Sequence, residues 1–180
     1  MQSESPLSFT PLETAGDDIA MAILRIRNEP AVRGNMYGDA PITEATHRAW
    51  LAGLAGNTSR RAFAALLDGR CVGFVGFTDI QPDHGRADWA FYLTGDVQGM
   101  GLGKALERAA LRHAFGPLAL NKLNCEVLEW NTPVIGLHRK FGFVEEGRRR
   151  AHIRRGGAYH DAVLLGLTRD DWRKQETDHD

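Results

Sequence analysis

The segment from Gln98 to Lys104 reads Gln-Gly-Met-Gly-Leu-Gly-Lys, in which three glycines alternate with larger residues. Glycine lets the backbone approach a ligand closely, and the apolar pattern that follows predicts a helix beginning near Gly101. The unpaired N–H groups and the positive dipole end of such a helix attract anions. The segment therefore predicts an anion site, and a phosphate group is the anion that fits it.

Several phosphate-binding loops share this composition. A P-loop requires Ser or Thr after its Lys, whereas Lys104 is followed by Ala105. A dinucleotide fingerprint has glycines at positions 1, 3 and 6 near the start of a βαβ unit, whereas these glycines fall at 99, 101 and 103 in mid-chain. Gln98, Gly101 and Gly103 instead resemble the acyl-coenzyme A loop of the GNAT acetyltransferases, which reads Gln or Arg, two residues, Gly, one residue, Gly or Ala. A glycine-rich turn without a ligand is the remaining alternative.

The composition is that of an ordinary globular chain of 180 residues, with 43% hydrophobic and 25% charged residues. The 22 basic and 23 acidic residues give a formal net charge of -1, which favours a small-molecule partner over nucleic acid or a membrane surface. Cys71 and Cys125 lack metal or redox spacing, and residues 1–4 lack the features of a signal peptide, so we expect a cytoplasmic protein. No apolar run approaches the roughly 20 residues of a membrane span.

The elements that must position the loop are strands and helices in mixed order. Strands are predicted at 6–12, 62–67, 71–80, 86–94, 122–129, 143–153 and 158–167, and helices at 17–28, 43–54, 101–115 and 132–140. The turn at Asp68-Gly69-Arg70 joins two of the three antiparallel strands expected before the glycine loop. Thr43 is a candidate N-cap, and residues 175–180 are expected to fray. This order predicts an α/β fold with a central mixed, mostly antiparallel sheet flanked by helices.

Residue-level similarity to the GNAT fold extends beyond the loop. Residues 87–93 (Ala-Asp-Trp-Ala-Phe-Tyr-Leu) resemble the family's central strand, and Asn131 with residues 136–143 resembles its segment from Asn to Gly-Phe. The resemblance covers residues 6–168 and implies a single GNAT acetyltransferase domain over 1–180 with acetyl-CoA as co-substrate. The residues it implies for acetyl-CoA binding are Phe91, Tyr92, Leu93, Gln98, Gly99, Met100, Gly101, Leu102, Gly103, Lys104 and Asn131.

The N-terminal half carries a narrower resemblance. Its aromatic and basic residues, together with residues 125–129 (Cys-Glu-Val-Leu-Glu), resemble the N-acetyltransferases of the pseudaminic acid pathway. These act on the 4-amino group of UDP-4-amino-4,6-dideoxy-N-acetyl-β-L-altrosamine, so the resemblance implies a nucleotide-sugar acceptor. The expected acceptor-binding residues are Arg27, Arg33, Met36, Tyr37, His47, Trp50 and Thr78. Core packing is the alternative role for Met36 and Trp50, and a surface position is the alternative for His47.

Two other functions stay open. Residues 142–147 and Asp161 also resemble the RimJ/RimL protein N-acetyltransferases, which implies a protein N-terminus as an alternative acceptor. The loop 31–41 distinguishes the two, because a protein N-terminus needs an open groove. A non-catalytic acetyl-CoA-binding module is the third possibility, and a homodimer is one expected assembly.

The chemistry of acetyl transfer needs a neutral amine, a polarised thioester carbonyl and a proton for the leaving thiolate. His138 stands where many GNAT enzymes carry a Tyr that protonates the thiolate, and an imidazole can also give a proton. Packing beside the co-substrate is the alternative role of His138. Asp88 and Glu126 are the candidates for receiving the amine's proton, although Asp88 could be an ordinary surface carboxylate and Glu126 could orient the sugar.

Two groups of basic residues and histidines are not assigned to the site. The run 148–150 of three arginines, with Arg154 and Arg155, is interpreted as the solvated face of a hairpin rather than an RNA site. His113, His152 and His160 lack the spacing of metal ligands, so no metal site is predicted.

Overall fold

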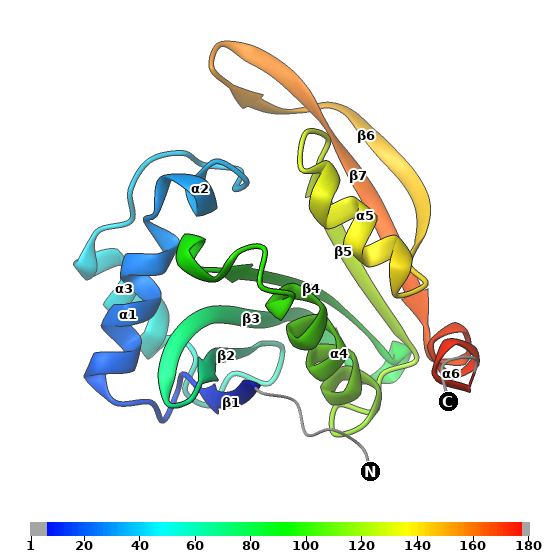
Figure 1. The fold of residues 1–180 in the computed structure, drawn as a ribbon, viewed down its shortest axis with the longest axis horizontal. Coiled ribbons are helices and arrows are strands. Elements are labelled where there is room, and N and C mark those ends of the chain that lie inside the picture. The colour runs from blue at the N-terminus through cyan, green and yellow to red at the C-terminus, as the bar shows by residue number, and fades with distance from the viewer. Residues whose placement is uncertain (1–6, 178–180) are drawn as a thin grey trace.

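The computed structural model describes residues 7–177 of the chain, which form a mixed α/β structure around one seven-stranded sheet (Figure 1). The strand order is β1-β2-β3-β4-β5-β7-β6. The strands are β1 (Leu7–Pro11), β2 (Arg61–Leu67), β3 (Arg70–Gln81), β4 (Arg86–Leu93), β5 (Lys122–Leu128), β6 (Val144–Arg155) and β7 (Ala158–Thr168). The helices are α1 (Asp17–Arg27), α2 (Pro30–Arg33), α3 (Glu44–Ala52), α4 (Leu102–Phe115), α5 (Thr132–Lys140) and α6 (Arg169–Thr177). The predicted mixed sheet flanked by helices is confirmed.

The predicted elements differ from the observed ones mainly at the two helices that the sequence did not indicate. α2 has four residues and begins at Pro30, directly after α1. α6 includes residues 175–177, so the prediction that this segment frays is wrong there, while 178–180 lie outside the described residues. Trp172 of α6 stacks on Phe115 of α4 with ring centroids 5.1 Å apart, which anchors the helix. Both missed helices lie beside the cavities described below.

The turn between β2 and β3 has the local chemistry that its sequence predicts. Asp68 and Gly69 both have positive φ, at 49° and 80°, as a two-residue hairpin turn requires. The N-cap of α3 is Thr43, whose hydroxyl oxygen accepts a hydrogen bond from the Thr46 backbone N–H at 3.2 Å. Local sequence signals therefore specify both the β2–β3 turn and the residue at which α3 begins.

The apolar residues of α4 are buried to different degrees. Leu102 and Leu106 are buried, while Ala105 and Ala109 are only half-buried. Glu107 is fully buried instead, at 0% exposure, on the side of the helix that faces α5. The helix thus carries a charged residue into the core, which hydrophobic periodicity alone could not predict.

The sheet splits between β4 and β5, the one parallel pair among the described strands. These strands are paired only over Arg86–Asp88 and Lys122–Asn124 and separate beyond that point. Figure 1 shows β1–β4 with α1–α3 on one side of the split, and β5–β7 with α5 on the other. Backbone groups on the two facing edges are therefore not joined to each other, and they can hydrogen-bond a ligand placed between the strands.

Candidate active site

A cavity of about 750 Å³ lies in the split between β4 and β5. Its size is that of a small-molecule site. Residues 89–93 of β4, 125–128 of β5, the glycine loop and the first half of α5 form its walls, and residues 31–38 close it from the side of α2. Seven of the residues expected to bind acetyl-CoA line it: Phe91, Tyr92, Leu93, Gln98, Gly99, Gly103 and Asn131.

The glycine loop adopts backbone conformations that explain its composition. Gly99 and Gly101 have φ of 83° and 79°, a region that side-chain-bearing residues rarely occupy, and Gly101 is the N-cap of α4. The first N–H groups of α4 have no partners within the helix and are available to an anion. Met100 and Leu102 lie outside the cavity lining, with the Met100 side chain exposed and the Leu102 side chain in the core. These two residues can contribute only their backbone groups.

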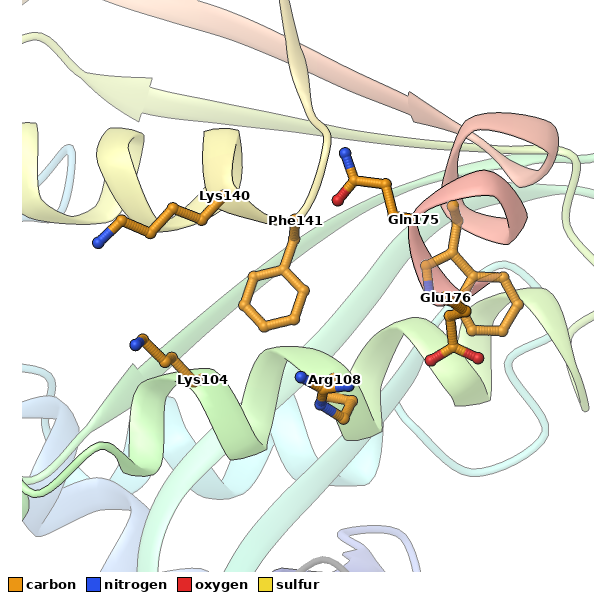
Figure 2. A pocket seen from close by; sticks show the side chains of 7 residues that line it. Lys104, Arg108, Lys140, Phe141, Gln175 and Glu176 are labelled. Atoms are coloured by element: carbon orange, nitrogen blue, oxygen red, sulfur yellow. The ribbon is translucent and has the colours of Figure 1, made fainter. Parts of the chain in front are cut away.

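A second cavity, of about 380 Å³, continues along the groove between α4 and α5 (Figure 2). Lys104 lines this cavity and not the larger one, together with Arg108 one turn later on α4 and Lys140 at the end of α5. Gly103, next to Lys104, lines the larger cavity, and a Cβ atom on it would lie 3.4 Å from the Leu137 side chain on α5. The groove therefore offers three cations just beyond the loop.

The far end of this basic groove is closed by α6 and by an aromatic ring. Figure 2 shows the Phe141 ring between α4 and α5, with Gln175 and Glu176 on α6 beside it. The guanidinium of Arg108 lies 5.9 Å from the centre of the Phe141 ring. Sequence reasoning missed Arg108 and Lys140. The signal that could have found Arg108 is its position four residues after Lys104, on the same face of α4.

His138 lies at the boundary between the core and the larger cavity. Its side chain is only 3% exposed and lines the cavity. The rings of Trp89, Phe91 and Phe143 surround it, with centroids 5.3, 5.9 and 5.1 Å away. Its Nδ1 atom lies 2.8 Å from Oε1 of the buried Glu107, a partner that sequence reasoning missed. The imidazole is thus held in one orientation beside the space where a thioester could bind.

The two candidate proton acceptors occupy different places. Glu126 lines the cavity from β5, and its carboxylate lies 3.1 Å from Nη1 of Arg149 and 3.6 Å from Nε2 of His152. Asp88 is exposed, accepts a hydrogen bond from Asn124 Nδ2 at 3.2 Å, and lies outside the cavity lining. The structure therefore does not bring Asp88 to the cavity, because Asp88 lies where β4 is still paired with β5, before the two strands separate.

Three of the expected acceptor-binding residues line the cavity: Arg27, Met36 and Tyr37. The Nη1 atom of Arg27 is buried and has no hydrogen-bond partner among the described residues. Burial also lowers the pKa of the Arg27 guanidinium, and the neighbouring Tyr92 partly opposes this shift. A half-buried cation with one buried, unpartnered N–H group is a site for an anionic or carbonyl-bearing ligand.

The other four expected acceptor residues do not reach the cavity. His47 is buried with its Nε2 atom 2.9 Å from the Ala20 carbonyl oxygen, so it joins α3 to α1. Trp50 packs on His47, with ring centroids 5.5 Å apart, and belongs to the smaller core cluster beneath α1 and α3. Thr78 pairs with Asp88 across β3 and β4, away from the cavity lining. Trp50 on α3 is therefore explained by packing in the core and not by a bound ligand.

Arg33 also has a structural role, because its guanidinium binds backbone carbonyl oxygens near α2. Its Nε donates to the Asn28 carbonyl oxygen at 3.0 Å and its Nη1 to the Asp39 carbonyl oxygen at 2.5 Å. These bonds hold the segment that follows α2 in a compact turn. Arg33 therefore shapes the loop that carries Met36 and Tyr37 instead of lining the cavity itself.

The hairpin of β6 and β7 reaches back to the same loop. Arg155 Nη1 donates to the carbonyl oxygens of Arg33, Gly34 and Met36, and Trp130 Nε1 donates to the Gly34 carbonyl oxygen at 3.1 Å. Residues 148–150 are exposed, as expected for a solvated face, but Arg155 is not. The interpretation of the whole basic run as solvated is therefore wrong for Arg155, which fixes the loop over the cavity.

No group of three or more His, Cys, Asp or Glu side chains within residues 7–177 is arranged to hold a metal ion. None of the helices in that range has the length and apolar character needed to cross a membrane. The glycine loop, the split strands and the basic groove together fit a long phosphorylated thioester such as acetyl-CoA.

Comparisons with known proteins agree with this geometry. The family model described as "Acetyltransferase (GNAT) domain" matches residues 7–144. An uncharacterized, SPbeta prophage-derived N-acetyltransferase of Bacillus subtilis, YokL, is 31% identical over 125 residues, which cover 69% of this chain and 71% of that protein. The spermidine N(1)-acetyltransferase of Escherichia coli K12 is 31% identical over 107 residues, covering 59% of this chain and 58% of the relative. The match therefore spans less than two thirds of the length of that spermidine enzyme.

Solved structures share the fold. The spermidine N-acetyltransferase of Vibrio cholerae, solved in complex with CoA and spermine, superposes with a TM-score of 0.86 at 20% identity, covering 94% of this chain and 99% of that one. Because the GNAT model covers most of the sequence, the chain belongs to the GNAT acetyltransferases, a family of acetyl-transferring enzymes that use acetyl-CoA.

Proposed function

We propose that this protein transfers the acetyl group of acetyl-CoA to the 4-amino group of a UDP-linked 4-amino-4,6-dideoxy sugar. The observation that carries the proposal is the buried, unpartnered Nη1 atom of Arg27 at the cavity wall. A diphosphate supplies both the negative charge and the hydrogen-bond acceptors that this guanidinium lacks in the free protein. The resemblance of the chain to the pseudaminic acid pathway enzymes supports an amino sugar of that pathway as the acceptor.

The loop after α2 supplies surfaces for the rest of a nucleotide sugar. Met36 and Tyr37 also line the cavity, and Tyr37 is 44% exposed. A flat base such as uracil can pack against a thioether and a phenol ring. The bonds from Arg155 to this loop support a fixed acceptor pocket, which suits a small molecule better than a polypeptide.

The charge of the cavity argues against a polyamine acceptor. Glu126 is the one Asp or Glu in the described lining, and Arg149 and His152 lie beside its carboxylate. A polyamine carries several ammonium groups, and binding it would need several carboxylates. We therefore infer an anionic acceptor, although the names of two relatives describe spermidine acetylation.

The co-substrate is proposed to lie along the groove from the split strands to the three cations. The backbone edges of residues 89–93 and 125–128 pair with the pantetheine arm, and the α4 N-terminus holds the pyrophosphate. Lys104, Arg108 and Lys140 bind the remaining phosphate of the nucleotide end. Acetyl-CoA supplies the activated acetyl group, and the residues of the chain orient it.

The protein groups that handle protons are proposed to be Glu126 and His138. Glu126 is placed to receive, directly or through water, the proton that the attacking amine loses. His138 is placed to give a proton to the sulfur that leaves. One backbone N–H of residues 91–93 polarises the thioester carbonyl. The homodimer expected from the sequence stays a prediction, which light scattering tests.

Competition and an acceptor panel test the proposed acceptor. UDP is expected to inhibit competitively against the amino sugar at millimolar concentration or below. Thiol release from acetyl-CoA is expected with the UDP-amino sugar and not with spermidine or with peptides that have a free N-terminus. Faster turnover of a peptide, together with no inhibition by UDP, would contradict the proposal and favour protein N-terminal acetylation.

A further inference from the structure

Glu107 is a charged residue in an apolar environment that the proposed function leaves unused. Its side chain has 0% exposure, and Leu106, Ala110 and Leu111 next to it on α4 are equally buried. Oε1 lies 2.8 Å from His138 Nδ1, while Oε2 has no hydrogen-bond partner among the described residues. Burying a carboxylate in this way is costly, so the pair with His138 needs a reason beyond packing.

The pair extends from the core to the cavity. Glu107 does not line the cavity, whereas His138 does. Nδ1 of the imidazole is engaged by Glu107, and Nε2 has no protein hydrogen-bond partner among the residues that the structure describes. Nε2 is therefore the ring nitrogen that is left for a ligand.

The protonation of the pair follows from burial. With one shared proton the pair is neutral, and the proton resides either on His138, as an imidazolium beside a carboxylate, or on Oε1 of Glu107. In both forms Nε2 carries a hydrogen. A proton on Oε2 is disfavoured, because that atom has no acceptor near it. Loss of the shared proton leaves a net charge of -1 in the core, which burial opposes.

Among the described residues, His138 is the charged partner that acts on the Glu107 carboxylate. Burial raises the pKa of Glu107, and the hydrogen bond and charge of His138 oppose this shift. The thiol of Cys125 on β5 also interacts with Glu107. Burial, together with the charges of Glu107 and Asp88, raises the pKa of this thiol well above the ordinary value. The aromatic rings that pack on His138 carry no charge; they belong to Trp89, Phe91 and Phe143.

We propose that Glu107 is the positioning residue that keeps a proton on His138 Nε2, so that the Glu107–His138 pair acts as one proton donor to the leaving sulfur. This inference rests on the proposed acetyl transfer. The amine nitrogen forms the C–N bond with the thioester carbon and loses one proton to Glu126, directly or through water. The C–S bond breaks, and the electron pair of that bond stays on sulfur, which takes the Nε2 proton. The pair is then left with Nδ1–H bonded to Oε1, and it regains a proton from solvent through the cavity after the products leave.

Substitution of Glu107 tests the inference by kinetics. Glu107→Gln keeps the size and a hydrogen bond to Nδ1 but removes the shared proton, so kcat is expected to fall by roughly 30-fold or more with an unchanged acetyl-CoA dissociation constant. The alkaline fall of kcat is expected at least one pH unit lower than in the wild type. Glu107→Leu is expected to fold, because an apolar residue suits this core, and to be as slow as Glu107→Gln.

Combining variants separates a proton role from a structural one. His138→Ala is expected to lower kcat by roughly 100-fold, and Glu107→Gln added to His138→Ala is expected to cause no further loss. Wild-type turnover in folded Glu107→Leu would overturn the inference. Additive losses in the double variant would overturn it as well.

NMR tests the pair without any acceptor. In the wild type, the ¹⁵N signals of the His138 ring are expected to show a hydrogen on Nε2, because Nδ1 is engaged by Glu107. In Glu107→Gln the fraction of His138 rings that carry hydrogen on both nitrogens is expected to fall. A wild-type ring without hydrogen on Nε2 would overturn the role of Glu107, even if the variants fail to fold. A wrong acceptor would abolish turnover but leave these signals unchanged.

Discussion

Asp88 of β4 and Asn124 of β5 are the last paired residues before these strands separate, and Asn124 Nδ2 lies 3.2 Å from Asp88 Oδ1. On one side of this pair the sheet is continuous. On the other side the free edges of the strands line the larger cavity. Asp88 therefore has a structural role at the edge of the site, because its carboxylate binds the neighbouring strand at the point where the two strands begin to separate.

The conformation of Gly101 leads to a prediction about acetyl-CoA affinity. Its φ of 79° is unfavourable for a side chain, and its backbone begins the helix proposed to hold the pyrophosphate. Gly101→Val is expected to weaken acetyl-CoA binding at least tenfold, which corresponds to about 1.4 kcal/mol. Isothermal titration calorimetry measures this change.

Gly69 provides the matched control for Gly101. It has a similar φ of 80°, but it lies in the turn between β2 and β3, away from the cavity lining. Gly69→Val is therefore expected to lower thermal stability without weakening acetyl-CoA binding. Unchanged affinity in a folded Gly101→Val protein would remove the loop from the binding site.

Arg27 allows stability and acceptor binding to be separated. The half-buried Arg27 guanidinium has a buried Nη1 atom without a partner, and an apolar side chain of similar length removes that desolvation cost, so Arg27→Met is expected to raise the melting temperature. The KM of an anionic acceptor is expected to rise at least tenfold, with little change in the KM of acetyl-CoA. Steady-state kinetics and thermal unfolding measure both effects.

The exposed Arg25 on the same helix supplies the control for Arg27. Arg25→Met removes the same charge from α1 without touching the cavity, and it is expected to leave both KM values unchanged. A fall in the acceptor KM of Arg27→Met, or an equal effect of Arg25→Met, would contradict an anionic acceptor held at Arg27.

The basic groove predicts which part of CoA the three cations recognise. Lys140→Ala is expected to weaken CoA binding about fivefold at low salt and to have little effect on 3′-dephospho-CoA, because the cation has then lost its phosphate partner. The difference is expected to shrink at high ionic strength. Arg150→Ala, which removes an exposed charge of β6, serves as the control. Equal losses for both ligands would place the 3′-phosphate elsewhere.

The sequence predicted the parts of the fold that local signals specify. Alternating apolar residues, the Asp68-Gly69 turn and the glycines of the loop each carry a physical requirement that is readable one segment at a time. The burial of Glu107 could not be read in this way, because it depends on α5 bringing His138 against α4. The same holds for His47, whose ring meets a carbonyl of α1 only after α3 has packed. Sequence reasoning thus failed for residues whose role depends on contacts between distant segments of the chain.

Arg155 connects the hairpin of β6 and β7 to the loop over the cavity, and this link predicts a change in acceptor binding without a change in chemistry. Its Nη1 donates to three carbonyl oxygens of the loop, and its guanidinium lies 5.6 Å from the centre of the Trp130 ring. Arg155→Met keeps packing against Trp130 but removes one donor from each of the three carbonyl oxygens, and the Met36 carbonyl oxygen loses its Arg155 donor while those of Arg33 and Gly34 keep the Met36 N–H and Trp130 Nε1. The loop that carries Met36 and Tyr37 therefore gains freedom. We expect the acceptor KM to rise about tenfold, kcat at saturation to change less than threefold, and hydrogen exchange to increase in residues 33–38. Arg154→Met, which changes the exposed neighbour, is expected to alter none of these, and an Arg155→Met protein with wild-type acceptor KM would show that the hairpin does not hold the acceptor pocket.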